Sequence, residues 1–256
     1  MKTFKTGAGN VSVIIFQTTE EAGNAAALKA KEIINKAIRQ KDLARIIVAT
    51  GPAHETLIKP LAKMLDIAWD KVEVFHMDEY VGISDTHPAS FRFWLKNWLV
   101  DKVNPKAVYY MPANAPDLET AMREYGSTLA RASIDVCFVG FGENGHIAFN
   151  DPHAADFHDP LLVKKVALAD SCKKQQVGEG HFKNIGAVPA EALTITCSTI
   201  MNCENLVCLI PEKRKARTVK KAIEGPLSPS CPASLVFTHN NAHVYLDKES
   251  ASLLSR

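Results

Sequence analysis

The sequence predicts an α/β protein in which a mostly parallel sheet is covered by helices on both faces. Short apolar runs of strand length alternate with longer amphipathic stretches of helical periodicity, which is the pattern of such sheets. A chain of 256 residues with 46% hydrophobic content can bury one substantial core, and no repeat or linker divides it. We therefore expect a single domain over residues 1–256.

The expected strands are short runs rich in Val, Ile and Phe. Continuous apolar runs of this kind are typical of parallel strands that are buried on both faces. The runs are 11–16, 45–49, 72–77, 107–111, 134–140, 193–196, 206–210 and 244–246.

Helical periodicity is clearest in residues 19–40, where Ala26, Ala30, Ile33 and Ala37 recur on one face. Thr18 or Thr19, followed by two glutamates, is a favourable helix start. Two more helices are expected at 117–129 and 212–223. A long loop is expected at 150–162, and the pattern of 232–239 leaves helix and strand open.

Composition excludes several classes of protein. The 30 basic and 28 acidic residues give a net charge of +2 and are scattered, so no nucleic-acid partner is expected. The longest apolar runs are strand-length, so no membrane span is expected, and the N-terminus lacks the features of a secretory signal. The six cysteines form no CxxC pair and are expected to be buried thiols. These features predict a cytoplasmic protein.

Two strand-end segments are unusually polar, and ligands of parallel sheets bind beyond such ends. Residues 49–54 (ATGPAH) join a strand to a helix, where exposed amides can bind phosphate, although the segment is no P-loop. Asp78 and Glu79 follow the run 72–77, and adjacent carboxylates at a buried strand end are costly to desolvate. A general base and a strand-capping ion pair explain them about equally well.

A third segment, 139–152 (VGFGENGHIAFNDP), carries the strongest signal. Gly140 and Gly142 allow the backbone to approach a ligand closely. Asn144, His146 and Asp151 add three polar side chains within eight residues. A histidine oriented by polar neighbours is the usual arrangement for moving a proton.

Other polar and aromatic groups have simpler explanations. His153 and His158, with Asp156 and Asp159, match no metal-site spacing, so no metal and no other cofactor are expected. The aromatic residues between 91 and 99 are interpreted as core or as a subunit interface, which leaves a homo-oligomer open.

The segments MDEYVG (77–82) and GFGENGHIAFNDP (140–152) resemble the signature segments of the glucosamine-6-phosphate deaminase family. That family belongs to a superfamily with the 6-phosphogluconolactonases and ribose-5-phosphate isomerases. The resemblance runs from about residue 46 to 254 and includes HPAS, NAPD, ALTI, EGP and CPAS in the same order. It implies a three-layer, Rossmann-like fold and an enzyme of the hydrolase/isomerase type.

By this resemblance, Asp78 is the base that moves a proton between C2 and C1 of the sugar. His146, with Asn144 and Asp151, is placed in the opening of the pyranose ring. The phosphate loop corresponds to Thr50, Gly51, Pro52, Ala53 and His54, and Lys215 to the phosphate-binding lysine. Glu79, Gly140 and Gly142 are further expected substrate contacts.

The sequence also departs from the family pattern. Asn144 stands where the family usually has an aspartate, and Asp151 where it usually has a glutamate. No arginine near Gly180 matches the family's phosphate-binding arginine, and Lys173, Lys174 or His181 are candidate substitutes. The loop after Asp151 lacks the Ser- and Arg-containing stretch that is associated with allosteric control.

The expected activity is conversion of glucosamine 6-phosphate or galactosamine 6-phosphate to a ketose 6-phosphate and ammonia. One alternative is a sugar-phosphate lactonase, but lactonases resemble a DER-type and a GxGxDGHTAS-type sequence at the two signatures. The other is a sugar-phosphate sensor without catalysis. Sensors of this fold carry a helix-turn-helix ahead of it, and the first strand expected here begins near Val11.

Overall fold

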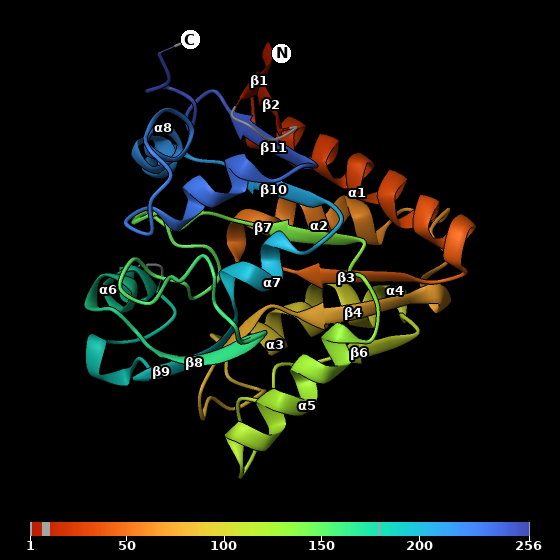
Figure 1. Cartoon of the computed structure of the whole chain (residues 1–256), viewed down its shortest axis with the longest axis vertical. Coiled ribbons are helices and arrows are strands. Elements are labelled where there is room, and N and C mark those ends of the chain that lie inside the picture. Colours follow the sequence, from red (N-terminus) through yellow and green to blue (C-terminus); the bar gives the residue numbers. More distant parts are fainter. Residues whose placement is uncertain (1, 7–10, 179, 256) are drawn as a thin grey trace.

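The computed structural model describes residues 2–6, 11–178 and 180–255. Its main feature is an eight-stranded sheet with the strand order β1-β2-β11-β10-β7-β3-β4-β6 (Figure 1). The strands of the chain are β1 (Lys2–Thr6), β2 (Val11–Phe16), β3 (Ala44–Val48), β4 (Val72–His76), β5 (Asp78–Tyr80), β6 (Ala107–Tyr109), β7 (Val136–Val139), β8 (Val163–Ala167), β9 (Glu191–Ile195), β10 (Leu206–Ile210) and β11 (Ala242–Asp247). The α-helices are α1 (Thr19–Lys41), α2 (Glu55–Ala62), α3 (Phe91–Leu95), α4 (Asp101–Val103), α5 (Leu118–Ala130), α6 (Asp170–Gly178), α7 (Cys197–Met201) and α8 (Ala216–Glu224).

Seven of the predicted apolar runs form the parallel part of this sheet. β3, β7 and β10 are buried along their whole length, as strands covered on both faces must be. β1, which the sequence analysis did not predict, pairs antiparallel with β2 at the edge of the sheet. The prediction of a mostly parallel sheet is confirmed.

The eighth apolar run forms part of a smaller sheet. β9 pairs antiparallel with both β5 and β8, and Asp78 lies opposite Thr194. β5 begins two residues after β4 ends, so the chain leaves the main sheet at Met77. A second hydrophobic cluster around Tyr80, Phe149 and Phe182 packs beside this sheet. The smaller sheet therefore fixes where Asp78 emerges from the core.

Helices cover both faces of the main sheet. α1 begins with a capping box in which Thr18 and Glu21 bind each other's backbone N–H. It packs on α2 and along β11, β10 and β3, whereas α7 lies on the opposite face (Figure 1). The three layers confirm the predicted architecture.

The segments that the sequence left open or misplaced have local explanations. Residues 150–162 form the predicted loop, and Pro232–Thr238 is a 3₁₀ helix. α8 begins later than predicted because Glu212 adopts a left-handed backbone (φ 79°) and Lys213–Lys215 forms a 3₁₀ turn first.

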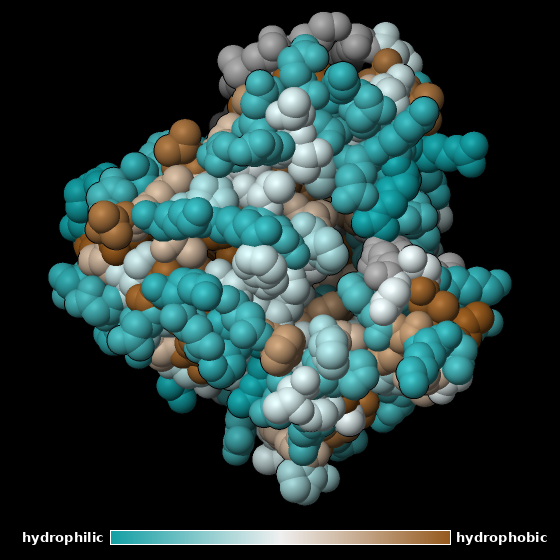
Figure 2. Space-filling model, turned by 180° about the vertical axis from the view of Figure 1, so that it is seen from behind, coloured by the Kyte–Doolittle hydropathy of each residue, from teal (hydrophilic) through white to brown (hydrophobic). Residues whose placement is uncertain are grey.

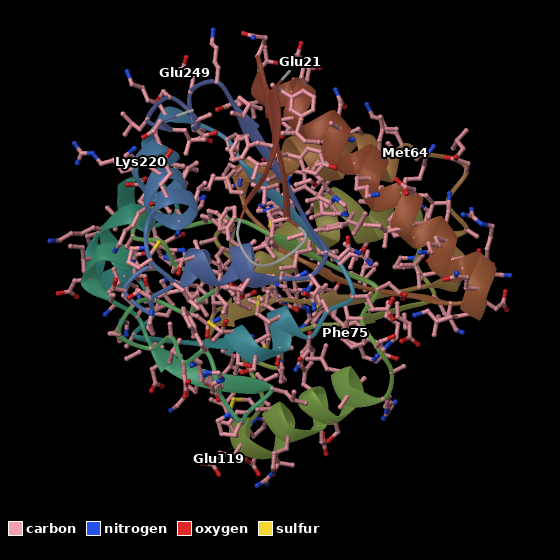
Figure 3. The ribbon with its side chains drawn as sticks, turned by 45° about the horizontal axis from the view of Figure 1, so that its top comes forward. Glu21, Met64, Phe75, Glu119, Lys220 and Glu249 are labelled. Atoms are coloured by element: carbon pink, nitrogen blue, oxygen red, sulfur yellow. The ribbon has the colours of Figure 1, made fainter. Side chains whose placement is uncertain are left out.

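Burial separates the core from the polar surface. Phe75 of β4 lies inside the fold, whereas Glu21, Glu119 and Lys220 lie at its periphery (Figure 3). Seen from behind, hydrophobic residues are scattered over a largely hydrophilic face (Figure 2). All six cysteines are buried and unbridged, as predicted. Within the described ranges, no helix combines the length and apolarity needed to cross a membrane.

Candidate active site

The polar segments predicted from strand ends meet in one pocket at the carboxyl edge of the main sheet. The loops after β3, β4, β7 and β10 converge there, as parallel topology requires. The predicted residues that line the pocket are Thr50, Gly51, Pro52, Ala53, His54, Asp78, Gly140, Gly142, His146 and Lys215. Three others, Glu79, Asn144 and Asp151, lie outside this lining.

Asp78 is a buried carboxylate that faces the pocket. It is 7% exposed, and no described residue donates a hydrogen bond to its carboxylate. Burial, reinforced by the charge of Glu79, raises the pKa of Asp78 from 3.8 to about 8. A carboxylate with a pKa near neutrality can both take up and release a proton, which suits a general base.

Glu79 points away from the pocket and supports the wall behind it. Its Oε2 accepts hydrogen bonds from Ser90 Oγ (2.7 Å) and the Arg92 backbone (2.8 Å), at the start of α3. Its Oε1 accepts from the backbone of Tyr80 and Phe91 (3.0 and 3.2 Å). Its carboxylate is thus occupied by the start of α3, outside the pocket lining, and its charge lies beside Asp78. A contact between Glu79 and substrate stays a prediction.

His146, Asn144 and Asp151 form a connected cluster. Asn144 Nδ2 donates to Asp151 Oδ1 at 2.6 Å, and Asn144 Oδ1 lies 2.9 Å from His146 Nδ1. Asp151 Oδ1 is also 3.3 Å from His146 Nδ1. Burial alone would raise the pKa of Asp151, but the hydrogen bonds to His146 and Asn144 outweigh it and lower the pKa. Only His146 of the three lines the pocket.

Gly142 lets the His146 ring occupy this position. A Cβ on Gly142 would lie 2.1 Å from His146 Cε1, which no side chain tolerates. The backbone closes the same turn, because Gly142 N–H donates to the His146 carbonyl at 2.9 Å. The first glycine of the motif is explained in the same way, since a Cβ on Gly140 would lie 2.6 Å from His54 Cε1.

A further part of the pocket lining is suited to an anion. Lys215 lines it and is only 5% exposed. Thr50 Oγ1 and His54 Nε2 are buried and have no hydrogen-bond partner among the described residues. Burial, with a contribution from the charge of Lys215, lowers the pKa of His54 to about 4, so this imidazole is neutral at pH 7. Buried polar atoms without protein partners beside a lysine indicate where a ligand supplies the missing contacts.

The pocket also contains residues that the sequence analysis missed. Arg214 lines it from the 3₁₀ turn before α8, with Nη1 3.2 Å from Glu143 Oε1 and Nε 2.5 Å from Glu212 Oε2. Its position directly after β10, beside Lys215, is the signal that could have revealed it. Among the candidate substitutes for the family's arginine, His181 lines the pocket, whereas Lys173 and Lys174 do not.

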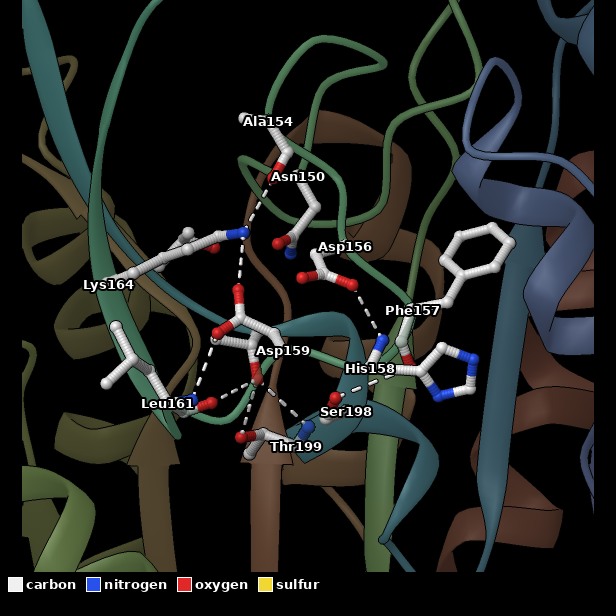
Figure 4. A network of polar contacts seen from close by, with 12 residues as sticks. Asn150, Ala154, Asp156, Phe157, His158, Asp159, Leu161, Lys164, Ser198 and Thr199 are labelled. Carbon is white, nitrogen blue, oxygen red and sulfur yellow. Dashed lines mark hydrogen bonds and ion pairs between the residues drawn. The ribbon is translucent and has the colours of Figure 1, made fainter.

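The long loop 150–162 is held by its own acidic residues. Lys164 Nζ binds Asp159 Oδ2 at 2.8 Å and the Ala154 carbonyl at 2.6 Å (Figure 4). Asp156 accepts a hydrogen bond from the His158 backbone at 2.8 Å. The part of the chain that the structure describes holds no group of three or more His, Cys, Asp or Glu side chains arranged for a metal. Asp156 and Asp159 therefore serve to shape the loop that begins at Asp151.

A polar pocket with buried ionisable groups, at the carboxyl edge of a parallel sheet, is typical of α/β proteins that bind a small ligand at that edge. A family model described as glucosamine-6-phosphate isomerases/6-phosphogluconolactonase matches residues 17–246. A glucosamine-6-phosphate deaminase of Listeria welshimeri is 34% identical over 92% of this chain and 98% of its own length.

Solved structures agree with this match. A monomeric glucosamine-6-phosphate deaminase, 29% identical, superposes with a TM-score of 0.85 over 94% of this chain and 99% of its own. A 6-phosphogluconolactonase of Trypanosoma brucei shares the fold, with a TM-score of 0.80 at 19% identity over 99% of this chain and all of its own. The chain belongs to the glucosamine-6-phosphate isomerase/6-phosphogluconolactonase family. The resemblance inferred from the two signature segments is thereby confirmed.

Proposed function

We propose that this protein is an enzyme that converts a hexosamine 6-phosphate, with glucosamine 6-phosphate as the first candidate, to the ketose 6-phosphate and ammonia. The observation that carries the proposal is that one pocket joins three groups: a buried carboxylate with a raised pKa, a hydrogen-bonded histidine and a buried lysine. Curated relatives that are 34% identical over nearly their whole length are glucosamine-6-phosphate deaminases, which supports the same activity.

Ring opening requires a proton to leave the anomeric hydroxyl and another to reach the ring oxygen. His146 faces the pocket and is held by Asn144, with Asp151 close behind. As a base, the imidazole takes the hydroxyl proton while the C1–O5 bond breaks and C1=O1 forms, and it then returns the proton to O5. While the imidazole of His146 holds this proton it is positively charged, and the Asp151 carboxylate stabilises that charge.

Isomerisation requires one base that serves two adjacent carbons. Asp78 removes the proton from C2 of the open-chain sugar while O1 takes a proton from the C2 ammonium, which gives an enolamine. Asp78 then delivers its proton to C1, and the bond from C2 to nitrogen becomes that of a protonated imine. Water then hydrolyses this imine to the ketone and ammonia. A cationic amino group at C2 would favour the ionised form of Asp78, which burial and Glu79 disfavour in the unliganded pocket. The two neighbouring carboxylates thus support an amino sugar in preference to a neutral one.

The 6-phosphate is assigned to the side of the pocket formed by Thr50, His54 and Lys215. The Thr50 hydroxyl is a donor without a hydrogen-bond partner in the part of the chain that the structure describes, and the ammonium of Lys215 supplies charge. Arg214, paired with Glu143 and Glu212, lies on the same side and is a further candidate for this contact. This assignment of the site residues rests on their positions in the pocket.

The two alternatives, a lactonase and a sensor, predict different outcomes in an assay. Two lactonase structures, one of them described as putative, are 20% and 19% identical to this chain, so they support the shared fold alone. A sensor would bind sugar phosphate without turnover. The cytoplasmic location and the homo-oligomer remain predictions.

The test is a panel of glucosamine, galactosamine and mannosamine 6-phosphates and 6-phosphogluconolactone, assayed for ammonia, ketose and acid release. Ammonia and ketose released in equal amounts from one amino sugar, and lost in Asp78→Asn, are the expected result. Hydrolysis of the lactone alone would replace the proposal with the lactonase activity. Saturable binding of a sugar phosphate without any product would replace it with the sensor.

A further inference from the structure

Asn144 is the least expected member of the His146 cluster, since the resemblance predicts an ionisable side chain there. It makes three short contacts, and two of its partners have a fixed polarity. Its Oδ1 lies 3.0 Å from the backbone nitrogen of His146, which can only donate. Its Nδ2 lies 2.6 Å from Oδ1 of Asp151, a buried carboxylate whose lowered pKa keeps it an acceptor at neutral pH.

These two partners determine which way the amide faces. With oxygen and nitrogen exchanged, the NH₂ group would meet the His146 N–H, and the amide oxygen would meet the Asp151 carboxylate. Both contacts would then be repulsive. The polarity of these two partners therefore fixes Oδ1 toward the His146 backbone and Nδ2 toward Asp151.

The amide orientation in turn fixes the histidine. Oδ1 of Asn144, an acceptor, also lies 2.9 Å from His146 Nδ1, and the next nearest acceptor, Asp151 Oδ1, lies 3.3 Å away. A neutral imidazole has a single N–H, and two acceptors facing Nδ1 require it there. We propose that Asn144 is a positioning residue that locks neutral His146 as the Nδ1–H tautomer, with the lone pair of Nε2 available to the substrate.

The lock has a consequence for the proton that the ring carries. No described residue makes a hydrogen bond to Nε2, and the ring lines the pocket. The locked tautomer can therefore begin the cycle only as a base at Nε2. After it takes the proton of the anomeric hydroxyl, Nδ1–H still donates to Asn144, and the positive charge lies beside Asp151. Transfer of the Nε2 proton to the ring oxygen restores the starting tautomer. This catalytic use rests on the proposed function, whereas the tautomer does not.

An amide performs this task differently from a carboxylate. An aspartate at 144 would accept equally well from the ring, but it would place two carboxylates 2.6 Å apart, where Nδ2 now donates to Asp151. One of the two would then retain a proton. Asn144 thus donates a hydrogen bond to Asp151 and accepts one from the His146 ring, and its amide does not itself titrate near neutral pH.

The direct test is the tautomer of His146 in the resting protein. Long-range ¹H–¹⁵N correlation spectra of histidine-labelled protein, recorded at a pH where the ring is neutral, distinguish protonated from unprotonated ring nitrogens. His146→Gln assigns the signal among the nine histidines of the chain. We expect a protonated Nδ1 and an unprotonated Nε2. A neutral His146 protonated at Nε2 would overturn the proposal, whatever the protein catalyses.

Variants at Asn144 separate a lock from a structural role. Asn144→Ala should give a mixture of tautomers and lower kcat for the cyclic substrate by about 10- to 100-fold, part of what a positioned acid–base group contributes. Asn205→Ala is the matched control, because it removes a half-buried amide that donates to the Asp135 carbonyl at the far edge of the sheet. It should leave the His146 signal unchanged. An unchanged pure tautomer in folded Asn144→Ala would contradict the lock. If that variant does not fold, the spectrum of the unmodified protein still decides.

Discussion

Asp78, which lines the pocket, and Asp151, which lies behind His146, are both buried, but their environments differ. Asp78 is 7% exposed and Asp151 is 1% exposed, yet the pKa of Asp78 rises to about 8 and that of Asp151 falls below 3.8. Burial raises the pKa of both. Asp151 receives hydrogen bonds from Asn144 and His146 that reverse the shift, whereas Asp78 has Glu79 as its charged neighbour.

The contrast shows that hydrogen bonding, and not the degree of burial, determines which of the two aspartates stays ionised. A carboxylate whose partners are all protein groups stays ionised and can stabilise a neighbouring charge. A buried carboxylate that receives no such hydrogen bonds has a raised pKa, and near neutrality it can both take up a proton from a substrate and release it. Asp151 therefore suits the support of His146, and Asp78 suits proton transfer at carbon.

Asp78→Asn should have the largest effect on activity. An amide cannot accept a proton from C2, so turnover should fall by at least about 10²–10⁴-fold, the contribution typical of a general base. Steady-state release of ketose and ammonia measures this, with circular dichroism to confirm folding. Near-normal turnover in the variant would remove Asp78 from the reaction.

His146→Gln should affect only one of the two chemical steps. We expect a loss of about 10²-fold or more with the cyclic substrate, because its ring must be opened. An open-chain analogue, which bypasses that step, should react at nearly the normal rate. Equal losses on both substrates would assign His146 to isomerisation or to binding.

Lys215→Ala should weaken the phosphate contact without changing the chemistry. One charge-assisted contact contributes on the order of 1.5–3 kcal/mol, so binding of the phosphorylated sugar should weaken by about 10- to 150-fold. Calorimetry with the 6-phosphate and with the unphosphorylated sugar provides the comparison. A similar loss for both sugars would place Lys215 outside the phosphate site.

Stability should respond to pH with opposite signs at the two aspartates. The folded pKa of Asp78 is raised, so the folded state loses stability as pH rises from about 4 to about 8, when the buried side chain ionises. Asp78→Asn should remove this loss and be more stable than the unmodified protein at pH 9, by on the order of 5 kcal/mol, but not at pH 4.

Asp151 has a lowered folded pKa, so its ionised form contributes stability that is present above about pH 4 and lost as pH falls further. Asp151→Asn should therefore destabilise the protein at pH 7 and have less effect near pH 3. Urea unfolding of both variants at several pH values measures these differences. If the effects of the two substitutions on the free energy of unfolding changed with pH in the same direction, the contrast between Asp78 and Asp151 would be wrong.

The main sheet could be predicted from sequence because β3, β7 and β10 are buried on both faces and show as continuous apolar runs. β1 was missed since its KTFKT sequence lies at an edge and pairs on one side alone. β5 was missed because it has three residues, two of them acidic, and its partner β9 is distant in sequence.

Most of the pocket lining was predictable since parallel topology brings strand ends together. The direction in which each side chain points was not. Glu79 follows Asp78 along β5 and therefore faces the other way, toward α3. Arg214 could be found only through its place after β10. The hydrogen bonds of Asn144, which accepts from His146 and donates to Asp151, span seven residues of an irregular loop and could not be predicted.

The comparison of the two buried aspartates requires that Asp78 titrates near neutrality while Asp151 stays ionised. Carboxyl ¹³C signals of aspartate-labelled protein, assigned with Asp78→Asn and Asp151→Asn, report both titrations in one experiment. We expect a midpoint near pH 8 for Asp78 and one below 3.8 for Asp151. Ordinary midpoints near pH 4 for both residues, in the folded and unliganded protein, would contradict it.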